Sequence, residues 1–211
     1  MRGRLLLLVL SLTALGRAEI IDRVAATAGD LVITTSDILR EIRLSAFMNH
    51  AQPDFSPQAQ REVASRLLER ALIDSEMELG RYAAPQPGES EPGLAAIKKE
   101  RFPTQDAYAK ALSAYGISEE DLEGFLFQQL AVVRFVDARF GPAVQVPETD
   151  MRDYYGEHFV KELGNRAPAF EEVRQEIEAA LRAQRANDLL EEWLKETKAR
   201  TRIEFKPEAF Q

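Results

Sequence analysis

The sequence contains no cysteine and only two histidines, His50 and His158. The absence of cysteine excludes disulfide bonds, zinc–thiolate sites and thiol nucleophiles. We expect both histidines on the surface near helix ends, and the sequence offers no serine or acid arrangement that would make either of them catalytic. It also lacks a glycine-rich phosphate loop after a strand. We therefore expect no nucleotide, cofactor or metal site, and an enzyme is disfavoured.

Positive charge is also scarce. The chain carries 27 Lys and Arg residues against 35 Asp and Glu residues, a formal net charge of -8 at pH 7. This sign disfavours nucleic acid as a partner, because nucleic-acid-binding surfaces are basic. Acidic clusters such as Glu119–Asp121 precede predicted helices, where carboxylates complement the helix dipole. A solvated helix start is therefore a better interpretation of them than paired acid–base catalysis.

Long apolar runs are confined to the start of the chain. Two early arginines precede an apolar run over residues 5–15, and a small-x-small site ends at Ala18. The run is too short to span a bilayer, which takes ~20 residues. We predict a signal peptide over residues 1–18, cleaved between Ala18 and Glu19, and an exported product without a transmembrane segment. Cleavage would remove three of the 27 basic residues and leave 24 against 35 acidic ones, a net charge of -11.

The segment after the leader predicts a β-hairpin that leads directly into a helix. Ile21–Thr27 is rich in β-forming residues, Gly29–Asp30 fits a two-residue turn in which glycine supplies a positive φ, and Leu31–Ile33 forms the return strand. Thr35 or Ser36 is then expected to cap the helix.

The remainder of the chain has a helical pattern, so the predicted fold class is mainly α with a small sheet. Apolar residues recur at helical spacing, and helix stops and capping residues separate the segments. The Pro-, Gly- and Glu-rich linker Ala83–Gly93 is the loosest stretch. The predicted helices are Ile38–Phe47, Pro57 toward Leu79, Ala95–Arg101, Thr104–Tyr115, a helix between the Ser118–Asp121 capping box and Gly141, and a long helix from Phe170 toward Lys198.

Several segments in sequence order carry a family resemblance. The chain resembles the SurA-type periplasmic chaperones in Ile21–Ala26, Gly29–Thr34 and Ser36–Ile38, and in the later segments given below. The resemblance covers nearly all of the expected mature chain. It implies a multi-helix chaperone domain in the periplasm, in which the alternating segment Arg200–Phe205 forms an edge strand paired with the N-terminal hairpin. The further matching segments are Arg101–Thr104, Tyr108, Leu112, Tyr115–Ser118, Gln128–Leu130, Val146–Tyr155 and Phe170–Phe205.

The chain departs from that family at one place. Fuller members carry one or two parvulin-type prolyl isomerase domains between the segment that ends near Phe159 and the long helix that begins near Phe170. Only residues 160–169 lie between them here, whereas even ~40 residues usually need disulfides or metals to fold alone. We therefore expect no isomerase domain and no isomerase activity. The expected organisation is a single domain over 19–211, with an N-terminal part 19–159, a linker 160–169 and a C-terminal part 170–211.

A binding role suits the remaining candidate residues. Phe125 lies on the main apolar stripe of its helix and is expected in the core, whereas Phe127 and Phe135 fall on other faces. At least one of these two must pack against a second element or face an open groove. Phe47 and Met48 add aromatic and adaptable surface. We predict that Phe47, Met48, Phe127 and Phe135 contact polypeptide.

The leading hypothesis is an exported, ATP-independent chaperone that holds unfolded polypeptides of the cell envelope, including outer-membrane proteins during their assembly. Two alternatives stay open. The first is a residual peptidyl-prolyl isomerase, which would accelerate isomerisation of a proline peptide. The second is an assembly-factor module of the envelope with one dedicated partner, which would bind a single protein rather than many unfolded ones.

Overall fold

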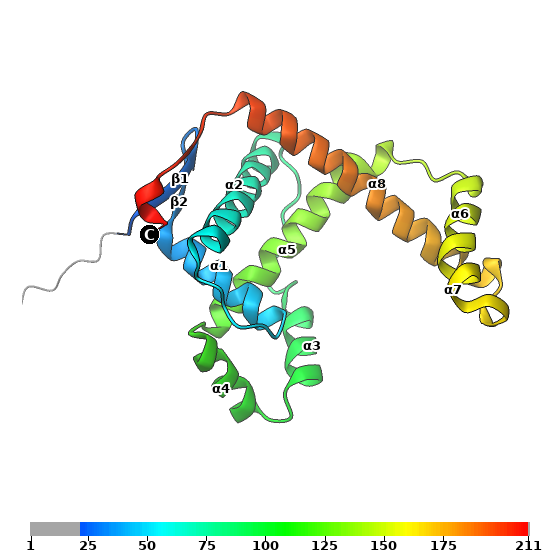
Figure 1. Ribbon diagram of the computed structural model, residues 1–211, viewed down its shortest axis with the longest axis horizontal. Helices are drawn as coiled ribbons and strands as arrows, with labels where there is room; N and C mark the ends of the chain where they lie inside the picture. The colour runs from blue at the N-terminus through cyan, green and yellow to red at the C-terminus, as the bar shows by residue number, and fades with distance from the viewer. Residues whose placement is uncertain (1–21, 211) are drawn as a thin grey trace, which may run out of the picture.

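The structure is a computed structural model that describes residues 22–210 (Figure 1). The predicted signal peptide, with its cleavage point between Ala18 and Glu19, lies outside the described residues. The fold is mainly α with one small sheet, as predicted. Its main elements are β1 Val24–Ala28, β2 Leu31–Thr34, α1 Thr35–Met48, α2 Pro57–Gly80, α3 Glu91–Arg101, α4 Gln105–Tyr115, α5 Glu119–Phe140, α6 Glu148–Tyr155, α7 Lys161–Leu163, α8 Phe170–Arg200 and β3 Ile203–Phe205.

The sheet joins the two ends of the described chain. Its order is β2-β1-β3, and both pairs are antiparallel. Ala28 pairs with Leu31 across a two-residue turn, in which Gly29 has a φ of 59°. On the other side of β1, Ala28 pairs with Ile203 and Ala26 with Phe205. The predicted hairpin and the predicted pairing of the C-terminal strand are both confirmed.

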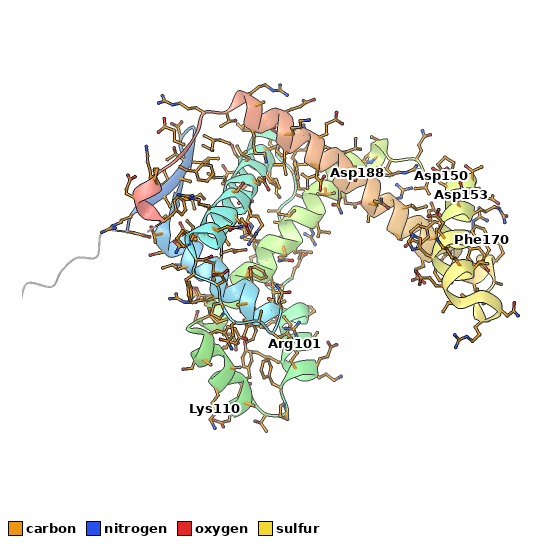
Figure 2. All side chains as sticks on the ribbon, in the orientation of Figure 1. Arg101, Lys110, Asp150, Asp153, Phe170 and Asp188 are labelled. Atoms are coloured by element: carbon orange, nitrogen blue, oxygen red, sulfur yellow. The ribbon has the colours of Figure 1, made fainter. Side chains whose placement is uncertain are left out.

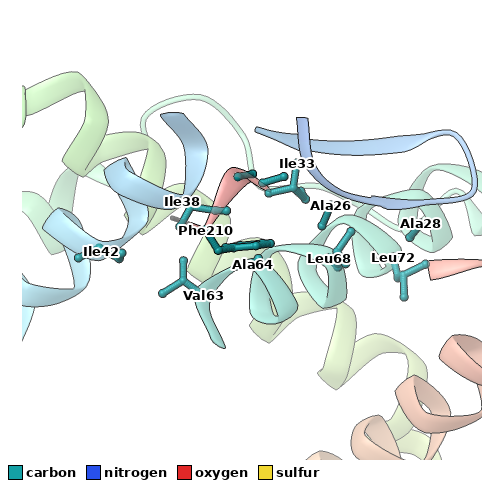
Figure 3. Packing of buried hydrophobic residues seen from close by; sticks show 12 residues of the cluster. Ala26, Ala28, Ile33, Ile38, Ile42, Val63, Ala64, Leu68, Leu72 and Phe210 are labelled. Carbon is teal, nitrogen blue, oxygen red and sulfur yellow. The ribbon is translucent and has the colours of Figure 1, made fainter. Parts of the chain in front are cut away.

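The inner face of the sheet covers the first core. The small side chain of Ala26 lets the sheet approach α2, where Ala64 and Leu68 are almost completely buried. Phe210, which follows β3, inserts its ring among these residues, as Figure 3 shows. It retains only 2% of its accessible surface. Residues from both ends of the described chain therefore share one hydrophobic core.

Local capping signals set most helix boundaries. The Ser118 hydroxyl accepts a hydrogen bond from the Asp121 N–H at 3.0 Å, and the Asp121 carboxylate accepts one from the Ser118 N–H at 2.9 Å, which confirms the predicted capping box of α5. The start of α1 differs from the prediction. Its cap is Thr34, whose extended backbone (φ -99°, ψ 165°) ends β2, whereas Thr35 already belongs to the helix.

The linker before α3 is shorter than predicted, because α3 begins at Glu91 rather than near Ala95. A proline in the first turn of a helix loses no intrahelical hydrogen bond, so Pro92 does not prevent an earlier start. The linker is also anchored. Ser90 is buried, and Glu89 forms an ion pair with Arg134 of α5.

Two helical projections extend from the body (Figure 1). One contains α3 and α4. The other, which we call the arm, contains α6, α7 and the first half of α8. Figure 2 labels Arg101 and Lys110 in the first projection and Asp150 and Phe170 in the arm. With 31 residues, α8 is about 46 Å long and joins the arm to the body.

The arm is a helical hairpin with its own small core. Met151 of α6 packs against Val173 and Ile177 of α8. The Tyr155 hydroxyl donates a hydrogen bond to the carbonyl of Pro168 at 2.7 Å. Residues 160–169, the predicted linker, form α7 and a 3-10 turn between α6 and α8. None of the helices described between residues 22 and 210 has an apolar stretch that could serve as a membrane span.

Phe210 offers a direct test of this closure. Because its ring is buried beneath the sheet, Phe210→Ala should lower the free energy of unfolding by about 3 kcal/mol. Phe205→Ala is the matched control, since Phe205 keeps 42% of its surface exposed and should cost less than about 1 kcal/mol. Urea unfolding followed by circular dichroism measures both. Equal losses in the two variants would contradict the packing described here.

Candidate polypeptide-binding grooves

The structure separates the four predicted contact residues. Phe47 is buried between the rings of Phe102 and Tyr115, with centroids at 6.0 and 5.5 Å, so it belongs to the core between α1 and the α3–α4 projection. Met48 is half-buried against the same cluster. Phe47 and Met48 therefore do not share a surface with Phe127 or Phe135.

Phe135 is also a core residue. It has no exposed surface, and its ring contacts those of Tyr82, Phe140 and Trp193. Phe127, on the same helix, is half-buried and lines open hollows instead. Of the two outcomes expected, Phe135 packs against a second element and Phe127 faces a groove. Phe125 is buried, as predicted.

The first hollow, which we call the Phe127 groove, lies between α1, α2 and α5. It has a volume of about 530 Å³. Its apolar lining comes from all three helices and from β2. On the other side of Phe127 an adjoining hollow of about 320 Å³ reaches Pro87 and Gly88 in the linker before α3. Gly124 borders both hollows, and a Cβ at this position would meet no atom within 4 Å. The apolar lining residues of the Phe127 groove are Ile33, Leu44, Leu67, Ala71, Phe125 and Phe127.

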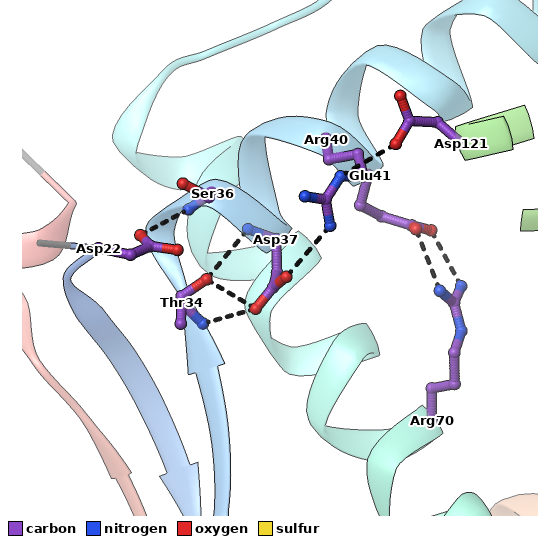
Figure 4. A network of polar contacts seen from close by, with 8 residues as sticks. All are labelled: Asp22, Thr34, Ser36, Asp37, Arg40, Glu41, Arg70 and Asp121. Atoms are coloured by element: carbon purple, nitrogen blue, oxygen red, sulfur yellow. Dashed lines mark hydrogen bonds and ion pairs between the residues drawn. The ribbon is translucent and has the colours of Figure 1, made fainter. Parts of the chain in front are cut away.

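A buried ion pair forms part of the groove. Arg70 of α2 donates two hydrogen bonds to the Glu41 carboxylate of α1, at 3.0 and 2.9 Å (Figure 4). Glu41 is only 7% exposed, so its carboxylate is shielded from water and receives its hydrogen bonds from Arg70. The pair fixes the separation of α1 and α2 beside the opening.

The other charges of the groove differ in how they are compensated. Arg40 lies 3.3 Å from Asp121 and 3.4 Å from Asp37. The pKa of Asp121 is lowered, chiefly by the hydrogen bond from the Ser118 N–H. The pKa of Asp74 is raised, because burial disfavours its charged form more than the positive charge of Arg70 favours it.

A second hollow, which we call the α5–α8 groove, lies where these two helices cross. It has a volume of about 410 Å³. Val133 projects into this region with 63% of its surface exposed. The sequence analysis missed the groove, although alanines three or four residues apart along α8 are a signal for one smooth helix face. Its small apolar lining residues are Val132, Val133 and Val136 of α5 and Ala179, Ala183 and Ala186 of α8. The polar residues Arg134, Asp137, Arg182 and Asn187 also line it.

The histidines lie apart from both grooves. His50 follows the end of α1 with a φ of 52°. The ring of His158 is tilted against that of Tyr154 in the arm, with the two centroids 4.2 Å apart. Both are exposed near helix ends, as predicted. Across residues 22–210 there is no group of three or more His, Asp or Glu side chains placed to hold a metal ion.

Removing Arg70 should test the buried ion pair. Arg70→Met leaves the Glu41 carboxylate buried without its partner, which should lower the free energy of unfolding by about 3 kcal/mol. The double variant Glu41→Leu/Arg70→Met should recover most of this loss, because the Glu41 carboxylate is no longer buried without its partner. Urea denaturation measures both. An Arg70→Met variant as stable as the wild type would contradict a structural role for the pair.

The raised pKa of Asp74 predicts a pH effect on stability. The pKa of this carboxyl group is higher in the folded state than its unfolded value of 3.8, so the folded state binds more protons between these two pKa values. The contribution of Asp74 to stability therefore falls as pH rises from the unfolded pKa through the folded pKa. Asp74→Asn should therefore be more stable than the wild type at about pH 7 and should lose this advantage at about pH 3.5. Thermal unfolding at both pH values measures the difference. A gain independent of pH would contradict this assignment.

Comparison of the whole chain with protein-family models finds no match, and comparison with curated proteins finds none either. The resemblance to SurA-type chaperones therefore stays a prediction from the order of its segments. The two grooves and their lining side chains are the structural observations from which a function can be proposed.

Proposed function

We propose that this chain is an exported, SurA-like, ATP-independent chaperone without prolyl isomerase activity, which holds unfolded polypeptides of the cell envelope in the periplasm. The observation that carries the proposal is the α5–α8 groove. It presents small apolar side chains from two helices, and within residues 22–210 no segment covers exposed Val133.

The shape of the molecule favours an extended client. The α5–α8 crossing lies at the base of the arm, and α5 runs from there toward the α3–α4 projection (Figure 1). Outer-membrane strands carry an apolar side chain at every second position. Such a strand can place one apolar side chain against Val133 and Ala183 while neighbouring residues run toward either projection. The alanines of α8 leave room for side chains of different sizes, which suits a binder of many sequences.

The magnitudes favour several weak contacts over one strong contact. Full burial of one Val or Leu side chain contributes about 1.5–3 kcal/mol. Association costs at least about 4 kcal/mol in lost translational and rotational freedom. One apolar contact is therefore not sufficient to hold a client. Simultaneous contacts at the α5–α8 groove and the Phe127 groove would raise the affinity through effective concentration.

The sheet edge supplies a weaker contact. The Gly29 N–H donates to the Arg202 carbonyl, and the Lys206 N–H donates to the Ala25 carbonyl. By the alternation of an antiparallel ladder, the backbone groups of Ile203 and Phe205 point to the free edge of β3. A client strand could add there. However, the short edge carries the flanking charges of Arg202, Glu204 and Lys206, a composition that limits strand addition.

The dedicated-partner module is the second candidate, because the α5–α8 groove is small, with a volume of about 410 Å³. One fixed helix or strand could fill a groove lined by only a few side chains. A chaperone and a dedicated module differ in the range of sequences that they hold. A client-holding assay therefore distinguishes them.

The mature protein should suppress aggregation of an unfolded outer-membrane β-barrel diluted from urea, at near-stoichiometric amounts, because a passive holder acts by mass action on the unfolded state. Light scattering measures the effect. Val133→Glu should weaken the suppression, because it replaces the most exposed valine side chain of the groove by a carboxylate. Leu79→Glu is the matched control, since Leu79 is 80% exposed at the end of α2, away from both grooves.

Circular dichroism must show both variants folded. If the wild-type protein leaves light scattering unchanged even in several-fold excess, the chaperone proposal fails and the dedicated-partner module becomes the better account. If Leu79→Glu impairs holding as much as Val133→Glu, the α5–α8 groove is not the contact surface.

A further inference from the structure

The Phe127 groove contains more acidic than basic side chains, and some of the acidic ones form no ion pair within residues 22–210. Two guanidinium groups, those of Arg40 and Arg70, line it. The acidic side chains that line the groove or its adjoining hollow are Asp37, Glu41, Asp74, Glu120, Asp121 and Glu123. Four more negative than positive groups therefore surround one apolar opening.

The ion pairs divide these groups into two sets. Arg70 is committed to buried Glu41, and Arg40 bridges Asp37 and Asp121. The second set consists of Asp74, Glu120 and Glu123, which form no ion pair with any residue between 22 and 210. These carboxylates come from α2 and α5, so they lie on different walls of the opening.

Phe127 provides an apolar surface beside these carboxylates. Phe127 separates the groove from its adjoining hollow and borders both. The Gln128 carboxamide oxygen, on the next residue of α5, is buried and accepts no hydrogen bond from the described residues. A peptide N–H is a donor that this acceptor lacks. The groove therefore combines an apolar surface, unpaired carboxylates and an unused hydrogen-bond acceptor.

We propose that the Phe127 groove binds segments of unfolded polypeptide in which an apolar side chain is flanked, two residues away, by Lys or Arg. In an extended segment, side chains two residues apart lie on one face about 7 Å from each other. The apolar side chain packs against Phe127, while the cations approach Glu120 and Glu123. The α5–α8 groove holds apolar side chains in general, whereas the Phe127 groove selects segments by charge.

The inference rests on the proposed function for the source of its ligand, but binding can be measured directly. The probe is a short fluorescein-labelled peptide of repeated Lys-Ser-Leu-Ser units, with Gln-Ser-Leu-Ser and Glu-Ser-Leu-Ser peptides for comparison. Fluorescence anisotropy with the mature protein should give the tightest binding for the lysine peptide and the weakest for the glutamate peptide. Binding of the lysine peptide should weaken between about 50 and about 200 mM salt.

Glu120→Gln/Glu123→Gln should weaken binding of the lysine peptide about fivefold and should leave the glutamine peptide unchanged, because each exposed charge contact contributes modestly. Phe127→Ser should weaken binding of both peptides. The matched control is Glu176→Gln/Glu191→Gln, which makes the same change in net charge on α8 at carboxylates that form no ion pair within the described residues. This control should bind all peptides like the wild type.

Equal affinity for the lysine and glutamine peptides would overturn the inference. An equal loss in the Glu176→Gln/Glu191→Gln control would also overturn it, because attraction would then come from the net charge of the whole molecule. Failure of the proposed function has a different signature. If peptides bind as described but the client still aggregates, the groove stands and the chaperone proposal fails. If holding persists without a lysine preference, only the charge selection is wrong.

Discussion

The pairing of β3 with β1 is the constraint on which the rest of the structure depends. It ties the segment after α8 to the hairpin that precedes α1, and it places Phe210 in the core between the sheet and α2. The C-terminal end of α8 is therefore fixed to the body. Since α8 is a straight rod of about 46 Å, fixing this end also directs the arm away from the body.

Grooves remain between helices that are otherwise well packed, because the core is divided. The chain does not gather its apolar residues into one large core but into four separate clusters, in the sheet and α2, the α3–α4 projection, the α5–α8 crossing and the arm. The Phe127 groove lies between the first two clusters and the α5–α8 groove borders the third, and small residues such as Gly124 and Ala183 do not fill the space. A larger side chain at these places would reduce the grooves without adding to any core.

The two grooves differ in the kind of contact that they offer. The α5–α8 groove is lined by small apolar side chains together with Arg134, Asp137 and Arg182, so charges of both signs lie beside its apolar surface. The Phe127 groove has three carboxylates that form no ion pair with residues 22–210, so its binding should depend on charge and salt. A polypeptide that reaches both would be held by weak contacts of two types, which suits a binder that must also release its client.

Local signals in the sequence predicted much of the fold. Gly29 in the hairpin turn and the Ser118 capping box each act within a few residues, so their effect can be inferred without a tertiary structure. Thr34 was missed as a cap because Thr34, Thr35 and Ser36 all have hydroxyl groups that can cap a helix. The early start of α3 was missed because Pro92 and Gly93 suggested a linker.

The candidate site was harder to predict, because burial on α5 depends on what packs around it. Phe125 faces α1 and the α3–α4 projection, Phe135 faces α8, and Phe127 lies between these contacts. Helical spacing shows that the three rings point in different directions but does not show which direction has a neighbour. The α5–α8 groove likewise depends on how two distant helices cross, which no local pattern contains.

The central claim is that unfolded polypeptide contacts the grooves rather than the surface at large. Site-specific photocrosslinking tests this most directly, with a photoreactive amino acid placed singly at Val133, Phe127 or Leu79 and an unfolded outer-membrane β-barrel as client. The account predicts crosslinks to the client from positions 133 and 127 and few from exposed position 79. Equal crosslinking from all three positions, or none from the two grooves, would contradict it.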